Sequence, residues 1–310
     1  MTRHLTSLYD FTPEELEKII DLAIELKNNP EKYSTVLKDK TLLMIFEKPS
    51  LRTRVSFEVG MTQMGGHAIF YSTADSAMGS KESIEDTVKT ASRYVDIIMA
   101  RLFEHEGIMK MAEASEVPVI NALTNFSHPC QIACDLQIIK EKKGKLKGLK
   151  LAYLGDSNNN VTHSLLYGCS MVGMDVFVGC PKGKEFEPQE KVIKKAKEFA
   201  EKHGSKVVVT NDAIEAAKNA DIIYTDSWMS YHIPKEKEAE RVKIFNPYQV
   251  NSELMKHAKP DAVFMNCLPA MRGYEQTAEV IDGPQSIVFD QAENRLHVQK
   301  AIMLFLLGKA

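Results

Sequence analysis

A short stretch of the chain places hydroxyl and guanidinium groups close together. Between an apolar run and a helix-like pattern, the residues FEKPSLRTRVSFE (46–58) carry Ser50, Arg52, Thr53 and Arg54. Backbone N–H groups at a helix start attract an anion, because they have no partner within the helix. Hydroxyls add further donors, and an arginine offers a planar fork that fits phosphate. The stretch therefore predicts phosphate binding; the alternative is a solvated arginine pair, with one arginine bridged to Glu47 or Glu58.

An alternation of strands and helices must position these residues. In the first half, short apolar runs indicate buried parallel strands at 41–46, 95–100 and 117–123. Helices are expected at 11–27, 54–66, 83–94 and 128–144. The first of these opens with Thr12 as the N-cap, Pro13 in the first turn and Glu15 three residues after the cap.

The second half repeats the alternation after a basic, glycine-containing stretch at 141–150 that suits a domain boundary. Strands are expected at 150–156, 175–180, 206–210, 221–226, 262–267 and 286–290. Helices are expected at 160–173, 188–204, 212–220, 251–258 and 292–308. The pattern predicts an α/β fold with two doubly wound parallel-sheet domains, at 1–145 and 146–290, and a C-terminal helix at 291–310 that crosses back to pack on the first domain.

Polar residues follow several of these strands. Ligands bind at the carboxyl ends of strands in parallel α/β sheets, so these residues are candidates for a site. In the first half they are Arg101, His128 and Gln131. In the second half they lie in the segments 156–160, 226–230 and 266–268.

Composition excludes several classes of protein. The 310 residues are 44% hydrophobic and 26% charged, which is typical of globular proteins, and the net charge of −3 gives no reason to expect a nucleic-acid or membrane partner. No apolar run approaches the roughly 20 residues of a membrane span, and the N-terminus lacks a signal-peptide pattern. The odd number of cysteines, five, favours reduced thiols in the cytoplasm. A nucleotide-dependent oxidoreductase is disfavoured because no GxGxxG follows a strand.

Separate motifs in a fixed order carry a resemblance. PSLRTRVSFE resembles the phosphate signature of the aspartate/ornithine carbamoyltransferase family. The further motifs are MAR ending at Arg101, HPCQ at 128–131, GDSNNN at 155–160, DSWMS at 226–230, NCLPAMRG at 266–273 and ENR at 293–295. They cover nearly the whole chain. Cys-Leu-Pro rather than Pro-Leu-Pro at 267–269 favours the ornithine branch.

The resemblance implies a reaction and its site residues. Family members transfer the carbamoyl group of carbamoyl phosphate to an amine; with the side-chain amine of ornithine, the products are citrulline and phosphate. By this likeness, carbamoyl phosphate is bound by Ser50, Leu51, Arg52, Thr53, Arg101, His128, Gln131, Cys267, Leu268, Arg295 and, from a neighbouring subunit, Lys81. The acceptor is bound by Asn160, Asp226, Ser230 and Tyr231. The catalytic residues are Arg101, His128, Asp226, Cys267 and Arg295.

The resemblance also implies a setting for the reaction: a cytoplasmic homotrimer, or a multiple of trimers, in arginine biosynthesis. Neither a metal nor an organic cofactor follows from the motifs. Donors aimed at the carbonyl oxygen agree with this chemistry, because amine attack places negative charge there.

Departures from the family pattern leave the acceptor open. Leu51 stands where threonine is usual, Ala77 where a polar residue is common, and Asn266 where histidine precedes Cys-Leu-Pro. Tyr231 and His232 replace Met-Gly in the segment that contacts ornithine. The same reaction on putrescine, lysine or another amine is therefore an alternative. A catalytically silent protein that binds carbamoyl phosphate is a third hypothesis, against which the retained arginines argue.

Overall fold

The computed structural model describes residues 2–74, 76, 78–79, 81–229 and 233–310. The chain divides into two compact units. The first comprises Met1–Glu141 and Glu293–Ala310, and the second comprises Lys142–Ala292.

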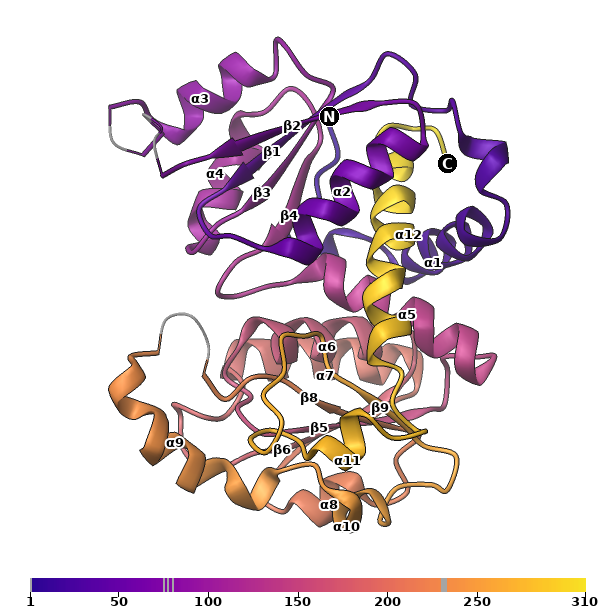
Figure 1. The fold of residues 1–310 in the computed structure, drawn as a ribbon, viewed down its shortest axis with the longest axis vertical. Helices are drawn as coiled ribbons and strands as arrows, with labels where there is room; N and C mark the ends of the chain where they lie inside the picture. The colour runs from indigo at the N-terminus through magenta and orange to yellow at the C-terminus, as the bar shows by residue number, and fades with distance from the viewer. Residues whose placement is uncertain (1, 75, 77, 80, 230–232) are drawn as a thin grey trace. The chain divides into compact units, whose positions relative to one another are not determined.

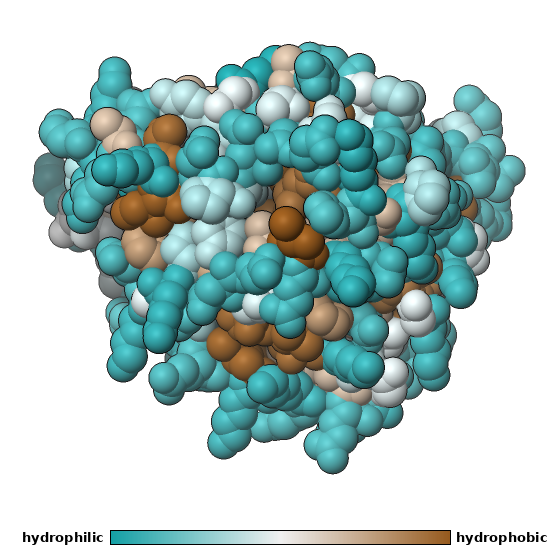
Figure 2. All heavy atoms as spheres, turned by 90° about the horizontal axis from the view of Figure 1, so that it is seen from below, coloured by the Kyte–Doolittle hydropathy of each residue, from teal (hydrophilic) through white to brown (hydrophobic). Residues whose placement is uncertain are grey.

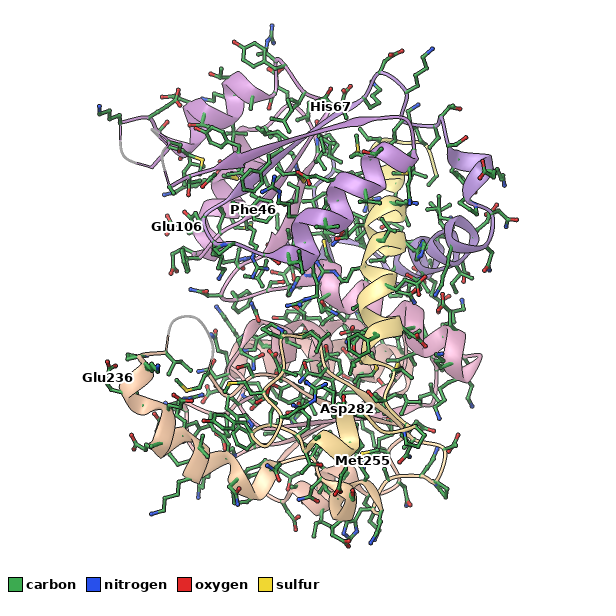
Figure 3. The ribbon with its side chains drawn as sticks, in the orientation of Figure 1. Phe46, His67, Glu106, Glu236, Met255 and Asp282 are labelled. Carbon is green, nitrogen blue, oxygen red and sulfur yellow. The ribbon has the colours of Figure 1, made fainter. Side chains whose placement is uncertain are left out.

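The first unit contains a parallel sheet. Its strands are β1 (Thr41–Phe46), β2 (His67–Ser72), β3 (Ile97–Arg101) and β4 (Val119–Leu123). Within the described residues their order is β2-β1-β3-β4, and each neighbouring pair is parallel. In Figure 3, Phe46 marks the carboxyl end of β1 and His67 the amino end of β2. The loops that carry the predicted phosphate residues leave the sheet at the carboxyl end.

Helices cover both faces of this sheet (Figure 1). They are α1 (Pro13–Asn28), α2 (Leu51–Gln63), α3 (Ile84–Ala91), α4 (His105–Ala114), α5 (Pro129–Lys143) and α12 (Val288–Leu306). Helices α3 and α4 lie on one side, where Val88 and Met111 join the apolar core with Ile98 of the sheet. Helix α12 packs against α2, as a hydrogen bond of 2.5 Å between Ser56 Oγ and the side-chain amide of Gln299 shows.

The first helix forms as its sequence predicts. Thr12 accepts a hydrogen bond from Glu15 N at 3.2 Å, and Glu15 Oε2 accepts one from Thr12 N at 2.9 Å. This reciprocal capping box satisfies N–H groups that the helix itself cannot pair. The helix then buries one apolar face: Leu16, Ile19, Ile20, Ala23 and Leu26.

The second unit is a second parallel sheet. Its strands are β5 (Lys150–Leu154), β6 (Asp175–Gly179), β7 (Val207–Thr210), β8 (Ile222–Thr225) and β9 (Val263–Met265). In the part of the chain that the structure describes, they follow the order β7-β6-β5-β8-β9. The helices are α6 (Asn160–Met171), α7 (Glu190–His203), α8 (Ala213–Ala217), α9 (Glu238–Phe245), α10 (Ser252–Met255) and α11 (Ala278–Ile281). The predicted α/β class with parallel sheets is confirmed.

Short 3₁₀ turns complete the elements: Leu8–Asp10, Pro30–Tyr33, Lys235–Lys237 and Asn246–Tyr248. Within the described residues, no helix combines the length and apolarity needed to cross a bilayer. Figure 2 shows one face of the molecule, on which hydrophilic side chains predominate and apolar patches lie between them.

The predicted strand at 286–290 is wrong. Helix α12 already begins at Val288, and Ser286 forms only an isolated bridge with Phe264. A short apolar run has the same pattern in a buried strand and in the first turn of a buried helix, so periodicity alone cannot separate them. Strand β2 and helices α4, α9 and α11 were not expected. Strand β2 lies at the edge of the sheet and its residues are exposed or half-exposed, although its sequence, HAIFYS, contains four apolar residues in a row.

Candidate active site

The start of α2 carries the first group of candidate residues. Ser50 is the N-cap: its Oγ accepts a hydrogen bond from Thr53 N at 3.3 Å and lies 3.1 Å from Thr53 Oγ1. Arg52 follows in the first turn and is half-buried. No acidic residue lies in this first turn. The helix start therefore presents N–H groups, hydroxyls and positive charge together, as an anion site requires.

Two further predicted residues lie at the carboxyl edge of the same sheet. Arg101 ends β3 and His128 immediately precedes α5; their side chains are 4% and 5% exposed. Burial and then the charges of Arg295, Arg101, Lys48 and Arg52 hold the pKa of His128 well below its usual value. His128 is therefore a neutral imidazole at neutral pH, able to donate one hydrogen bond and accept another.

Helix α12 brings a residue from the end of the chain to this group. Arg295 Nη1 donates to Gln131 Oε1 at 2.7 Å, and Nη2 lies 3.4 Å from Thr53 Oγ1. Gln131 in turn donates to Asp135 Oδ1 at 2.9 Å. The structure thus brings together residues from the start of α2, the start of α5 and α12.

Lys48 also belongs to this cluster, although it was not predicted as a site residue from the sequence. It is 4% exposed, its Nζ donates to Asn125 Oδ1 at 3.2 Å, and it lies 4.6 Å from the ring centre of Phe103. Burial, followed by the charge of Arg101, lowers the pKa of Lys48 to about 8. Its position two residues before Ser50 was the available signal, but a single lysine in a loop is usually solvated.

Other predicted residues of this unit lie apart from the cluster. Arg54 forms an ion pair with Glu58 at 3.2 Å and lies over the ring of Phe70, so the solvated alternative holds for this arginine. The side chain of Leu51 is 75% exposed, and Lys81 is also exposed.

The second unit holds a carboxylate beside a thiol. Asp226 follows β8 and Cys267 follows β9, the neighbouring strand, and Cys267 Sγ donates to Asp226 Oδ1 at 3.2 Å. Both side chains are half-buried. Leu268 follows directly with φ of 56°, a left-handed conformation that non-glycine residues rarely adopt.

The segment after β5 builds the adjoining part of this unit. Asn159, rather than Asn160, is the N-cap of α6 and accepts from Thr162 N at 2.9 Å; Asn160 is half-buried in the first turn. Gly155 has φ of +122°, and a Cβ there would lie only 2.9 Å from Trp228 Nε1. Glycine is therefore required where this loop passes the Trp228 ring.

Two buried carboxyls lie near Asp226: Asp156, which belongs to the candidate segment 156–160, and Glu275, which was not predicted from the sequence. Asp156 forms a buried ion pair with Arg241, which also donates from Nε to the Trp228 carbonyl at 2.7 Å. Burial, partly offset by the Arg241 charge, raises the pKa of Asp156 to about 6. Burial also raises the pKa of Glu275 to about 7, with a further contribution from Asp226. Because raised pKa values favour the protonated form near neutral pH, and because Arg241 balances Asp156, these two carboxyls add little negative charge to the second unit.

Some predictions cannot be placed. Ser230 and Tyr231, with Ala77 and His232, lie outside the described residues. In the described part of the chain, no group of three or more histidine, cysteine or acidic side chains could hold a metal ion. A surface cavity of about 460 Å³, lined by residues of α10, α11 and the loop before β9, contains none of the candidate residues.

The fold and these residues define a class: an α/β protein with a basic anion site in one unit and a carboxylate–thiol pair in the other. Residues 3–141 match the family model described as "Aspartate/ornithine carbamoyltransferase, carbamoyl-P binding domain". Residues 147–306 match "Aspartate/ornithine carbamoyltransferase, Asp/Orn binding domain". The chain belongs to the aspartate/ornithine carbamoyltransferase family.

Individual relatives agree over the full length. An ornithine carbamoyltransferase from Methanocaldococcus jannaschii is 51% identical, with 98% of each chain covered. One from Pyrococcus furiosus, named anabolic, is 50% identical, covering 99% of this chain and 96% of the relative. The solved structure of the Pyrococcus furiosus ornithine carbamoyltransferase superposes with a TM-score of 0.95 at 48% identity and covers 100% of this chain and 98% of that one.

Proposed function

We propose that the protein transfers the carbamoyl group of carbamoyl phosphate to the side-chain amine of ornithine, giving citrulline and phosphate. The observation that carries the proposal is the buried basic cluster of the first unit. In this cluster Arg101, Arg295 and the neutral His128 lie with the start of α2. Relatives of the chain are named ornithine carbamoyltransferase. Burying several like charges is costly unless an anion balances them, and carbamoyl phosphate supplies that anion.

Each residue of the first unit then has a chemical role. Ser50, Thr53 and Arg52 hold the phosphate with the N–H groups of Leu51 and its neighbours. Arg101, Arg295 and His128 face the carbamoyl oxygen, where they stabilise the negative charge that develops as the amine attacks. Gln131 orients Arg295 through its hydrogen bond of 2.7 Å.

The second unit provides the acceptor. Asp226 binds the amino acid with Asn160, Ser230 and Tyr231, while Cys267 and the Leu268 carbonyl contact the reacting groups. The amine nitrogen forms the new C–N bond, the C–O bond to phosphate breaks, and the amine releases a proton. Because the mixed anhydride of carbamoyl phosphate is already activated, no covalent enzyme intermediate is needed.

The test is citrulline formation by the purified protein. Ornithine, putrescine, lysine and acetylated ornithine are supplied in turn with carbamoyl phosphate, and the ureido product is counted. Highest kcat/KM with ornithine supports the proposal; faster turnover of another amine reassigns the acceptor. No product with any amine, together with calorimetric binding of carbamoyl phosphate, identifies a silent binding protein.

We further propose a biosynthetic direction, a cytoplasmic location and a homotrimer. The named anabolic relative supports the first of these. The five cysteines, all within the described residues, are thiols rather than disulfides, which suits the cytoplasm. Exposed apolar side chains on α2 and β2, namely Val55, Ile69 and Phe70, offer a surface for a neighbouring subunit.

Lys81 gives the assembly a direct test. If it serves the neighbouring subunit's site, Lys81→Ala and Arg52→Ala proteins are each inactive, but refolded mixtures recover activity at sites that contain neither change. Light scattering should give about three times 34.9 kDa. A monomer, or mixtures without recovery, would contradict a shared site.

A further inference from the structure

The loop after β9 holds Leu268 in a conformation that it would not adopt by itself. Its φ of 56° lies in the left-handed region, which carries a cost for a residue with a branched side chain. The Asn266 side chain supports this conformation, because Oδ1 accepts a hydrogen bond from Leu268 N at 2.8 Å. A side chain that caps the N–H two residues later closes a local turn.

A second amide continues from Asn266 across the loop. Asn266 Nδ2 donates to Gln276 Oε1 at 3.0 Å, and Gln276 Nε2 donates to the Met271 carbonyl at 3.1 Å. Both side chains are fully buried. The Leu268 N–H can only donate and the Met271 carbonyl can only accept, so the two ends fix the orientation of both amides. We call this pair, Asn266 and Gln276, the amide bridge.

The amide bridge is itself held in place. Asn266 N donates to Oε1 of the buried Gln291 at 3.1 Å, and Met271 N donates to Glu275 Oε1 at 2.7 Å. Within the span of the bridge lies Cys267, whose thiol donates to Asp226. Because both bridging groups are neutral amides, their own hydrogen bonds do not change as the carboxyls around the loop gain or lose protons.

We propose that Asn266 and Gln276 are positioning residues for carbamoyl transfer, which hold the Cys267 thiol and the Leu268 carbonyl in the geometry that the reaction needs. The inference rests on the proposed function, because only there do Cys267 and Leu268 meet the substrates. Neither amide touches a reacting atom in this scheme. They act through the backbone between them.

A first variant, Gln276→Met, removes the far half of the amide bridge and keeps the bond from Asn266 to Leu268. Misplacing a reacting group by a fraction of an ångström should lower kcat by about tenfold or more. The KM for carbamoyl phosphate should stay unchanged, since most of its contacts lie in the first unit. The matched control is Gln285→Met, because Gln285 donates to the Ala262 carbonyl at the opposite end of β9.

A second variant, Asn266→Asp, tests the bridge through pH. When protonated, the introduced carboxyl can still accept from Leu268 N and donate to Gln276 Oε1. When ionised, it presents only acceptors to that oxygen, which is repulsive. The ratio of variant to wild-type kcat should therefore fall as pH rises, and the fall should weaken in the double variant Asn266→Asp, Gln276→Met.

A readout independent of turnover separates this inference from the proposed function. The rate at which iodoacetamide alkylates Cys267, mapped by mass spectrometry, should change in Gln276→Met and follow pH in Asn266→Asp. If the wild-type protein transfers no carbamoyl group but the variants show these alkylation changes, the proposed function is wrong and the role of the amide bridge in positioning Cys267 stands. A flat pH ratio, or a Gln276→Met protein with a lower melting temperature but wild-type kcat and alkylation rate, would overturn the positioning role.

Discussion

Arg295 donates from Nη1 to Gln131 Oε1 at 2.7 Å, which joins residues 164 positions apart in the sequence. Both side chains are almost completely buried. The contact makes helix α12 part of the anion site of the first unit, although the whole second unit lies between the two residues in the chain. A segment near the C-terminus therefore completes a site that begins at the N-terminus of α2.

Alanine substitution of the arginines of this site is predicted to reduce activity far more than substitution of their neighbour Arg54. Arg52→Ala or Arg101→Ala should lower kcat/KM by about a hundredfold to a thousandfold, because Arg52 holds the phosphate and Arg101 stabilises the negative charge that develops on the carbamoyl oxygen. Arg54→Ala should change it little, since Arg54 is engaged with Glu58. Initial rates and calorimetric binding of carbamoyl phosphate measure the difference. Equal losses in all three variants would contradict the assignment.

Lys48 predicts a pH dependence. A bound anion favours the protonated ammonium, so affinity for carbamoyl phosphate should weaken as pH rises through about 8, the pKa that burial gives this lysine. The free energy of unfolding of the ligand-free protein should change in the opposite direction and increase as pH rises. The unfolded chain holds this proton up to its ordinary pKa of 10.5, so Lys48 adds stability as pH rises from about 8 toward that value.

Calorimetric titrations from pH 7 to 9.5 test the Lys48 prediction on wild type, Lys48→Met and Lys48→Arg. The methionine variant should bind more weakly at pH 7 and lose the added pH dependence, whereas the arginine variant should stay charged throughout. If wild type and Lys48→Met follow parallel curves, Lys48 takes no part in binding.

Asp226 is predicted to act on the acceptor alone. Asp226→Asn should lower kcat/KM for ornithine by roughly thirtyfold, which corresponds to about 2 kcal/mol for one charged hydrogen bond. The dissociation constant of carbamoyl phosphate should not move. Asp282→Asn is the control, because Asp282 forms an exposed ion pair with Arg272 at 2.5 Å in the same unit. Weaker carbamoyl phosphate binding in Asp226→Asn would place this residue elsewhere in the reaction.

Substitutions of Gly60 should separate the effect of helix propensity on stability from the effect of steric crowding. It lies inside α2, where an added Cβ would meet Lys300 Cγ at 3.4 Å and Met303 Cε at 3.6 Å, which are ordinary contacts. Gly60→Ala should stabilise the protein by up to about 1 kcal/mol through helix propensity. Gly60→Leu should destabilise it by about 1–3 kcal/mol, because the larger side chain must displace α12. Denaturant unfolding provides the measurement, and a loss of stability in Gly60→Ala would show that the α2–α12 contact tolerates no added atom.

Features that depend on neighbours in the sequence were predictable. The capping box of Thr12 and Glu15 and the cap at Ser50 follow from residues three positions apart. The central strands follow from continuous apolar runs, because a parallel sheet covered on both faces buries every residue of such a run. Edge strand β2 was missed although residues 68–71 form a short apolar run, and the run at 286–290 was assigned to a strand although helix α12 begins within it, because such a short run does not by itself distinguish these structures.

The amino-acid sequence by itself determined the parallel α/β class, the helix starts and the motifs that mark the family, since each rests on short-range spacing. Only the tertiary structure decided which of these residues meet. In the structure Arg295 donates a hydrogen bond to Gln131, whereas Arg54 forms an ion pair with Glu58. Lys48 and Glu275 are buried, and burial shifts the pKa of each. The physical reason is that desolvation and long-range hydrogen bonds depend on which segments pack together, and packing partners far apart in the chain leave no local pattern to read.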